Sequence, residues 1–86
     1  MPLVCVHGPL RRLAGGAGEH QLRAATVPEL LRELERAYPA LRGWIVDERG
    51  LIRRHINVFV NGERSGEQTA VAADSRVEIL PAITGG

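Results

Sequence analysis

The chain of 86 residues contains a single cysteine, no lysine and only three aromatic side chains. The lone thiol of Cys5 excludes an internal disulfide framework and a zinc site built on several cysteines. Without lysine, the chain offers no Schiff-base nucleophile and no acceptor for lysine-directed modification of itself. Because Tyr38, Trp44 and Phe59 are its only aromatic residues, the core must be built from Leu, Val, Ile and Ala.

A strong charge of one sign and long apolar runs are also missing. Eleven Arg against ten acidic residues give a formal net charge of +1, which is too small for the electrostatic footprint of a nucleic-acid-binding protein. No segment approaches the roughly 20 apolar residues of a membrane helix, and the N-terminus does not resemble a secretory signal. We therefore expect one small domain in the reducing cytoplasm, with neither nucleic acid nor a membrane as partner.

The N-terminal residues are typical of a β-hairpin. The segment 3–6 is short, apolar and rich in β-branched residues, and Gly8-Pro9 bounds it, which indicates a buried strand. Residues from about Glu19 to Ala24 alternate weakly and are polar, so we expect a second strand paired with the first. The glycine-rich segment 15–18 between them lacks the Lys-Ser/Thr of a phosphate-binding loop and is interpreted as a turn.

A helix is predicted to begin after Thr26. Thr26 and Glu29 have the spacing of a capping box, in which each side chain satisfies an unpaired backbone N–H. Pro39 should end the helix, because the residue before a proline is driven out of the α region. One stripe of the helix is apolar and should face the core, and it comprises Val27, Leu30, Leu31, Leu34 and Tyr38.

The second half of the chain favours two further strands. Residues 40–46 could add one or two helical turns, and then Ile56–Val60 alternates as a strand. Asn61-Gly62 is the strongest short hairpin signal, and Val77–Leu80 alternates again until Pro81. Together these segments predict an α+β domain with a helix packed on one face of a sheet.

Alternation also predicts which side chains face the helix. One set should point inward and meet the helix stripe, and it comprises Val4, Val6, Val58, Val60, Val77 and Ile79. Phe59 and Leu80 should then lie on the opposite face as an exposed apolar patch that anchors partners.

The order of elements resembles the ubiquitin-like sulfur carriers, which include the small subunit of molybdopterin synthase, the thiamine sulfur carrier and the carrier of a cysteine-synthesis route. The resembling segments are residues 10–16, 55–62 and 77–86, and the last one closes on Gly85-Gly86. The resemblance spans nearly the whole chain. It implies a β-grasp (ubiquitin-like) mixed sheet with one main helix on one face, a β-grasp domain over residues 1–81 and a flexible tail over residues 82–86.

The resemblance also implies a function for the terminal carboxylate of Gly86. In this family an ATP-dependent E1-like enzyme adenylates that carboxylate, and a sulfur donor converts it to a thiocarboxylate. A sulfur-accepting synthase then uses the sulfur for molybdopterin, cysteine, thiazole or a specialised metabolite. The chain would thus be a protein cosubstrate and not an enzyme, with no cofactor bound to itself. Two terminal glycines suit this role, because they fit a narrow channel in conformations closed to other residues.

The expected site therefore comprises Gly85 and Gly86 as the reacting end. Its expected partner contacts are Phe59, Leu80, Pro81, Ala82, Ile83 and Thr84. The alternative is a ubiquitin-like modifier, conjugated through the same glycine to lysines of other proteins. A third reading, an interaction module that uses its sheet face, leaves the diglycine unexplained.

Other features of the sequence favour structural roles. Cys5 could carry a persulfide, but a lone cysteine inside an apolar strand usually behaves as a small hydrophobe. His7, His20 and His55 share no ligand spacing, so no metal site is expected. The pairs at 11–12 and 53–54 are arginines that are either solvated or dock an acidic partner.

Overall fold

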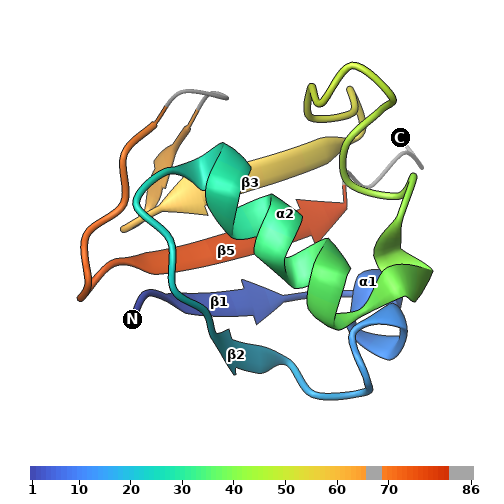
Figure 1. The fold of residues 1–86 in the computed structure, drawn as a ribbon, viewed down its shortest axis with the longest axis horizontal. Coiled ribbons are helices and arrows are strands. Elements are labelled where there is room, and N and C mark those ends of the chain that lie inside the picture. Colours follow the sequence, from blue (N-terminus) through green and yellow to red (C-terminus); the bar gives the residue numbers. More distant parts are fainter. Residues whose placement is uncertain (66–68, 82–86) are drawn as a thin grey trace.

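A five-stranded mixed sheet carries one long helix on one of its faces (Figure 1). The computed structural model describes residues 1–65 and 69–81. The strands have the spatial order β2-β1-β5-β3-β4. In chain order the elements are β1 (Leu3–Val6), α1 (Pro9–Leu13), β2 (Glu19–Gln21), α2 (Val27–Ala37), the 3₁₀ turn η1 (Pro39–Leu41), β3 (Ile56–Val60), β4 (Glu63–Arg64) and β5 (Arg76–Pro81).

Strand β5 occupies the centre of the sheet. It pairs in parallel with β1 and antiparallel with β3, so Ile79 has Val6 on one side and Val58 on the other. The N-terminal hairpin is confirmed, with β1 antiparallel to β2. The second hairpin is confirmed as well, and its turn residues Asn61 and Gly62 have φ angles of 51° and 86°. Two positive φ angles define the type I′ turn that Asn-Gly favours.

Helix α2 begins and ends as the sequence predicts. The Thr26 hydroxyl accepts a hydrogen bond from Glu29 N at 3.3 Å. The return bond differs from the expected capping box, because Glu29 Oε1 accepts from Ala25 N, at 3.0 Å, and not from the N-cap residue. Tyr38 is the C-cap and Pro39 follows it. The helix start is also tied to the segment before β5, since Val27 N donates to Thr69 O at 2.8 Å.

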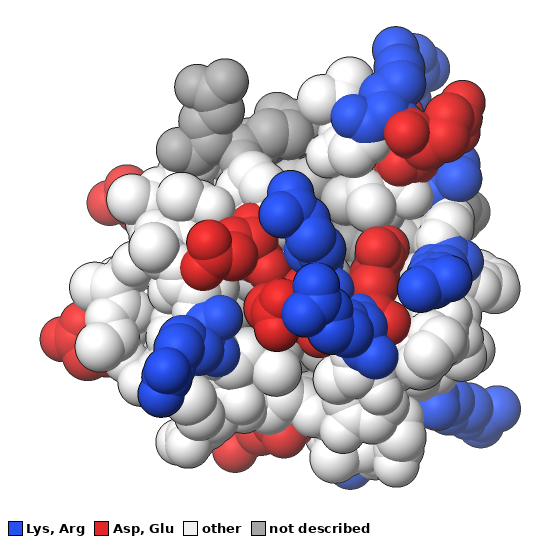
Figure 2. Space-filling view, in the orientation of Figure 1, with Lys and Arg blue, Asp and Glu red and all other residues white. Residues whose placement is uncertain are grey.

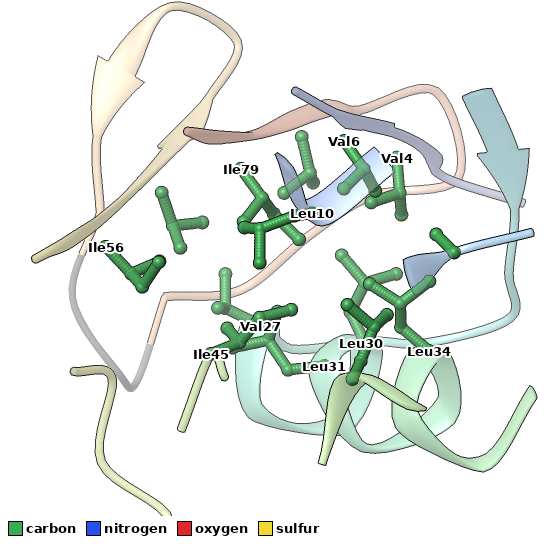
Figure 3. Packing of buried hydrophobic residues seen from close by; sticks show 14 of the residues in the cluster. Val4, Val6, Leu10, Val27, Leu30, Leu31, Leu34, Ile45, Ile56 and Ile79 are labelled. Carbon is green, nitrogen blue, oxygen red and sulfur yellow. The ribbon is translucent and has the colours of Figure 1, made fainter. Parts of the chain in front are cut away.

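The core lies between α2 and one face of the sheet (Figure 3). The predicted inward set is confirmed: its members are buried, except that Val60 is half-buried against the core. On the helix, the apolar stripe is buried apart from half-buried Tyr38. The cluster is completed from outside the long helix and the strands by Leu10, Ala14, Leu41, Ile45 and Val71. The sheet register expected from alternation is therefore correct.

Two segments differ from the sequence prediction. No element was predicted for residues 9–13, and they form the short helix α1 with Pro9 in its first turn. Proline is favoured there because it has no N–H to leave unpaired. The helical turns expected over residues 40–46 reduce to η1, after which Gly43 takes a φ of 83° and Val46 bridges to Ile52. Among the residues that the structure describes, no helix is long and apolar enough to cross a membrane.

Candidate functional site

The predicted site begins at the end of β5, which is the central strand of the sheet. Pro81 lies opposite Ile56 of β3 and is the last residue that the structure describes. A proline has no backbone N–H, so it cannot donate another ladder hydrogen bond. The expected contact residues Ala82, Ile83 and Thr84 and the expected reacting residues Gly85 and Gly86 lie outside the described residues.

Gly8 brings the end of β1 against the end of β5. Its φ is +64°, and a Cβ atom at this position would stand 3.0 Å from Cγ of Pro81. Any other residue would be strained in conformation and crowded against the proline ring. The backbone N–H of His7 also donates to Ile79 O at 3.1 Å. Helix α1, which starts after Gly8, is thus held beside the point where β5 ends (Figure 1).

Phe59 and Leu80 lie on the sheet face opposite α2, as expected from the register. Both are half-buried, so the apolar patch between them is less exposed than the sequence predicted. Across the ladder Phe59 is opposite Glu78, and Leu80 is opposite Asn57. Polar neighbours therefore interrupt the patch, and Pro81 next to it is also half-buried.

Cys5 is buried, but it does not point into the core beneath α2. It alternates with Val4 and Val6, so its side chain belongs to the opposite sheet face, between Glu19 and Glu78 in the two ladders. The side chain is 2% exposed. Burial raises the pKa of the Cys5 thiol, Arg76 lowers it to a smaller extent, and the two carboxylates raise it. A thiol that stays protonated at neutral pH is a poor nucleophile, which disfavours a persulfide on Cys5.

The histidines occupy three separate places on the surface or its rim. His7 Nε2 lies 3.3 Å from Glu78 Oε1 on the outer face of the sheet. His20 makes an edge contact with Tyr38, with ring centroids 5.0 Å apart, and His55 is exposed. No group of three or more His, Cys, Asp or Glu that could hold a metal ion occurs in residues 1–65 and 69–81.

The two arginine pairs noted in the sequence lie in different surroundings. Arg11 Nε donates to Gly16 O at 3.0 Å and so supports the turn after α1. Arg53 and Arg54 line a groove together with Arg64 of β4. No pattern in the sequence points to Arg64, because only the β3–β4 hairpin brings it beside Arg53 and Arg54. The short helix α1 was missed too, although proline just after Gly8 was a usable signal for it.

The chain is similar to sulfur carriers and to small archaeal modifier proteins. Small archaeal modifier protein 1 of Haloferax volcanii is 35% identical over 79 residues, which cover 86% of this chain and 91% of that protein. Sulfur carrier protein CysO of Mycobacterium tuberculosis is 31% identical over 83 residues, which cover 90% and 89%.

Solved structures of similar fold can be aligned with this chain. The crystal structure of the Amycolatopsis orientalis BexX/CysO complex contains a chain with a TM-score of 0.90 and 30% identity, and all of both chains is covered. The crystal structure of SAMP1 from Haloferax volcanii gives a TM-score of 0.88 at 30% identity, covering 99% and 98%. The expected ubiquitin-like β-grasp fold is thereby confirmed.

A protein-family model also matches nearly the whole chain. It matches residues 4–86, from the second residue of β1 to the diglycine. The resemblance inferred from the sequence is thus confirmed by comparisons of both sequence and structure. This chain belongs to the ThiS family.

Proposed function

We propose that this protein is a sulfur carrier whose reacting group is the carboxylate of Gly86. The observation that carries the proposal is the extent of the family match, which runs through residue 86 and so includes Gly85-Gly86. A relative that is 31% identical is named a sulfur carrier protein. The position of β5 supports the proposal further, because a strand paired on both sides anchors the residues that lead to the diglycine.

The chemistry requires activation before sulfur can be added. A carboxylate is a poor acyl donor, so an E1-like enzyme would first join a Gly86 oxygen to the α-phosphorus of ATP and release pyrophosphate. Hydrosulfide then attacks the acyl carbon, AMP leaves and a thiocarboxylate remains. ATP and the sulfur donor belong to the activating enzyme, and this chain contributes the acyl group as a cosubstrate.

The folded domain would present that group to two partners in turn. The described part of the contact surface would be formed by Phe59, Leu80 and Pro81, because Leu80 and Pro81 end β5 and Phe59 lies on the adjacent strand β3. In the Amycolatopsis orientalis structure, CysO is in a complex with BexX. We propose a comparable docking of this chain on a sulfur-accepting synthase.

The test is mass spectrometry of the intact protein after incubation with ATP, its activating enzyme and sulfide. One carboxylate oxygen should be replaced by sulfur, and the change should localise to the peptide after Arg76. Deletion of Gly86 should abolish the change, whereas Cys5→Ala should retain it. Residues added after Gly86 should block it unless they are trimmed. Sulfur found on Cys5 would show that the proposed mechanism is wrong.

A second candidate function is protein modification, which is favoured by 35% identity to a protein named a small archaeal modifier. The activated glycine would then acylate lysines of other proteins, while this chain, lacking lysine, could not extend itself through lysine linkages. Trypsin cleaves after Arg76, so a modified lysine would carry residues 77–86 as a branch. Detection of that branch in cell extracts would establish the modifier function, and a thiocarboxylate without such branches would favour the carrier.

A further inference from the structure

A groove lined by three arginines lies on the outer edge of β3. It has a volume of about 240 Å³ and runs between the loop before β3 and the β3–β4 hairpin. Arg53 and Arg54 contribute from the loop, and Arg64 contributes from β4. Ile56 and Val58 of β3 line it as well. The described residues that line the groove include no Asp or Glu.

The three guanidinium groups are not neutralised within the part of the chain that the structure describes. Among the described residues only two arginines have an acidic partner within ion-pair distance: Arg49 Nη2 lies 3.0 Å from Asp47 Oδ2, and Arg36 Nη1 lies 3.6 Å from Glu33 Oε2 on α2. No described carboxylate lies within ion-pair distance of Arg53, Arg54 or Arg64.

One donor in the groove is also enclosed without an acceptor. Arg53 Nε is shielded from solvent and has no hydrogen-bond partner among the described residues. A buried N–H without an acceptor is unfavourable, and more so when the group is charged. A groove of unpaired cationic donors is therefore suited to an anion supplied from outside the described chain.

The groove is one strand away from the end of β5. Arg53 O accepts a hydrogen bond from Ile56 N at 2.9 Å, and Ile56 is paired with Pro81. Paired residues in an antiparallel ladder have Cα atoms only about 4.5–5.5 Å apart. In Figure 2, blue and red side chains lie side by side where the loop before β3 lies in Figure 1, and further blue side chains follow down the right edge. An enzyme surface that contacts Pro81 would therefore lie close to the groove.

We propose that this groove docks acidic side chains of the enzyme that acts on Gly86. The proposal rests on the function proposed above. Arg and carboxylate groups form paired, geometrically specific hydrogen bonds, and complementary charge speeds association and fixes orientation. A volume of about 240 Å³ is smaller than the roughly 300–1,000 Å³ of typical small-molecule sites. This size favours one or two carboxylate side chains over a nucleotide.

The first test needs no enzyme. The full chain, labelled with ¹⁵N, is titrated with a peptide of alternating Glu and Gly, with the same peptide carrying Gln, and with inorganic phosphate. The Nε–Hε signals of Arg53, Arg54 and Arg64 should shift with the Glu peptide and not with the Gln peptide. Those of Arg32 and Arg36 on α2 should not shift and serve as the internal control.

Three outcomes of this titration would overturn the proposal. Equal shifts at all arginines would show unspecific charge attraction. Equal or stronger shifts with phosphate at the same concentration would show a site for small oxyanions. Shifts that depend on protein concentration without any peptide would show that a second copy of this chain occupies the groove.

The second test measures activation of Gly86 by the E1-like enzyme. The rate is monitored as release of pyrophosphate. The double variant R53E/R64E should raise the KM for this chain roughly tenfold or more, with kcat within about twofold, because the lost contacts serve encounter and not chemistry. The control R32E/R36E makes the same charge change on the exposed part of α2 and should leave KM within about twofold. Added NaCl should raise KM for the wild type more than for R53E/R64E.

These results separate the two proposals. An unchanged KM for R53E/R64E would refute the docking groove while leaving the carrier function intact. If the wild type is not activated at all, the carrier function fails, and the titration alone decides whether the groove takes carboxylates. Should R53E/R64E unfold, as judged by its melting temperature, R53Q/R64Q removes the same contacts without introducing new charge and is used in its place.

Discussion

Two neighbouring residues of β5 should respond very differently to truncation. Ile79 is completely buried between β1 and β3 and faces α2, whereas Leu80 is half-buried on the opposite face. We expect Ile79→Ala to destabilise the domain strongly and Leu80→Ala to destabilise it weakly. The same pair should show the reverse order in binding to the activating enzyme, because only Leu80 lies on the proposed contact surface.

The magnitudes follow from burial. Replacing a buried Ile by Ala costs about 2–5 kcal/mol, since a cavity adds to the lost transfer free energy. A half-buried Leu can lose only about half of the roughly 1.5–3 kcal/mol of full burial, or about 1 kcal/mol, and it leaves no cavity. A domain of 86 residues has a free energy of unfolding of roughly 4–13 kcal/mol. At about 4–8 °C per kcal/mol, a loss of about 3 kcal/mol lowers Tm by roughly 12–24 °C.

The assay is urea unfolding followed by circular dichroism, with the wild type measured in parallel. The slope of the unfolding free energy against urea should stay constant, so that the midpoints report stability alone. KM for activation is then measured well below the lowest Tm. If Leu80→Ala cost as much free energy as Ile79→Ala, the assignment of the two sheet faces would be wrong.

Three further outcomes are expected. Thr26→Ala should lower the free energy of unfolding by about 1 kcal/mol, because Glu29 N loses its capping acceptor, and Thr26→Ser should nearly restore it in urea melts. Burial raises the pKa of Cys5, so this thiol ionises at a higher pH in the folded state than in the unfolded state. Stability should therefore fall as pH rises through about 8.5, and a melt series with Cys5→Ala should lack that part of the fall. Burial also raises the pKa of Glu35. The charged carboxylate therefore lowers the free energy of unfolding above about pH 4.3. Glu35→Gln should stabilise the fold more at pH 7 than at pH 4, and equal effects at both pH values would contradict this reasoning.

Local signals in the sequence determined the elements that depend on neighbouring residues. The start of α2 was predictable because Thr26 and Glu29 act within one turn, and its end because Pro39 acts on the residue before it. The type I′ turn at Asn61-Gly62 was predictable because both residues tolerate positive φ. Alternation in Val77–Leu80 also settled which side chains face the helix, since a strand has a period of two.

The reacting end was also inferred from sequence, through the resemblance that the diglycine at 85–86 completes and the family match later supported. No geometry was needed for that inference, because the proposed chemistry involves only the terminal carboxylate. The extent of the contact surface was harder to judge. The exposure of Phe59 and Leu80 depends on the neighbouring strands. These place Glu78 opposite Phe59 and Asn57 opposite Leu80.

Tertiary structure alone decided how distant segments meet. Antiparallel pairing of β1 with β2 and parallel pairing of β1 with β5 together put Cys5 between Glu19 and Glu78 on the outer face. The groove on β3 needs Arg53 from a loop and Arg64 from a hairpin strand, and no periodic pattern links residues of such different elements. Sequence periodicity reports the face that a residue takes within its own helix or strand. Which side chains share a site depends on the strand order and on the loops, because these determine which elements become neighbours.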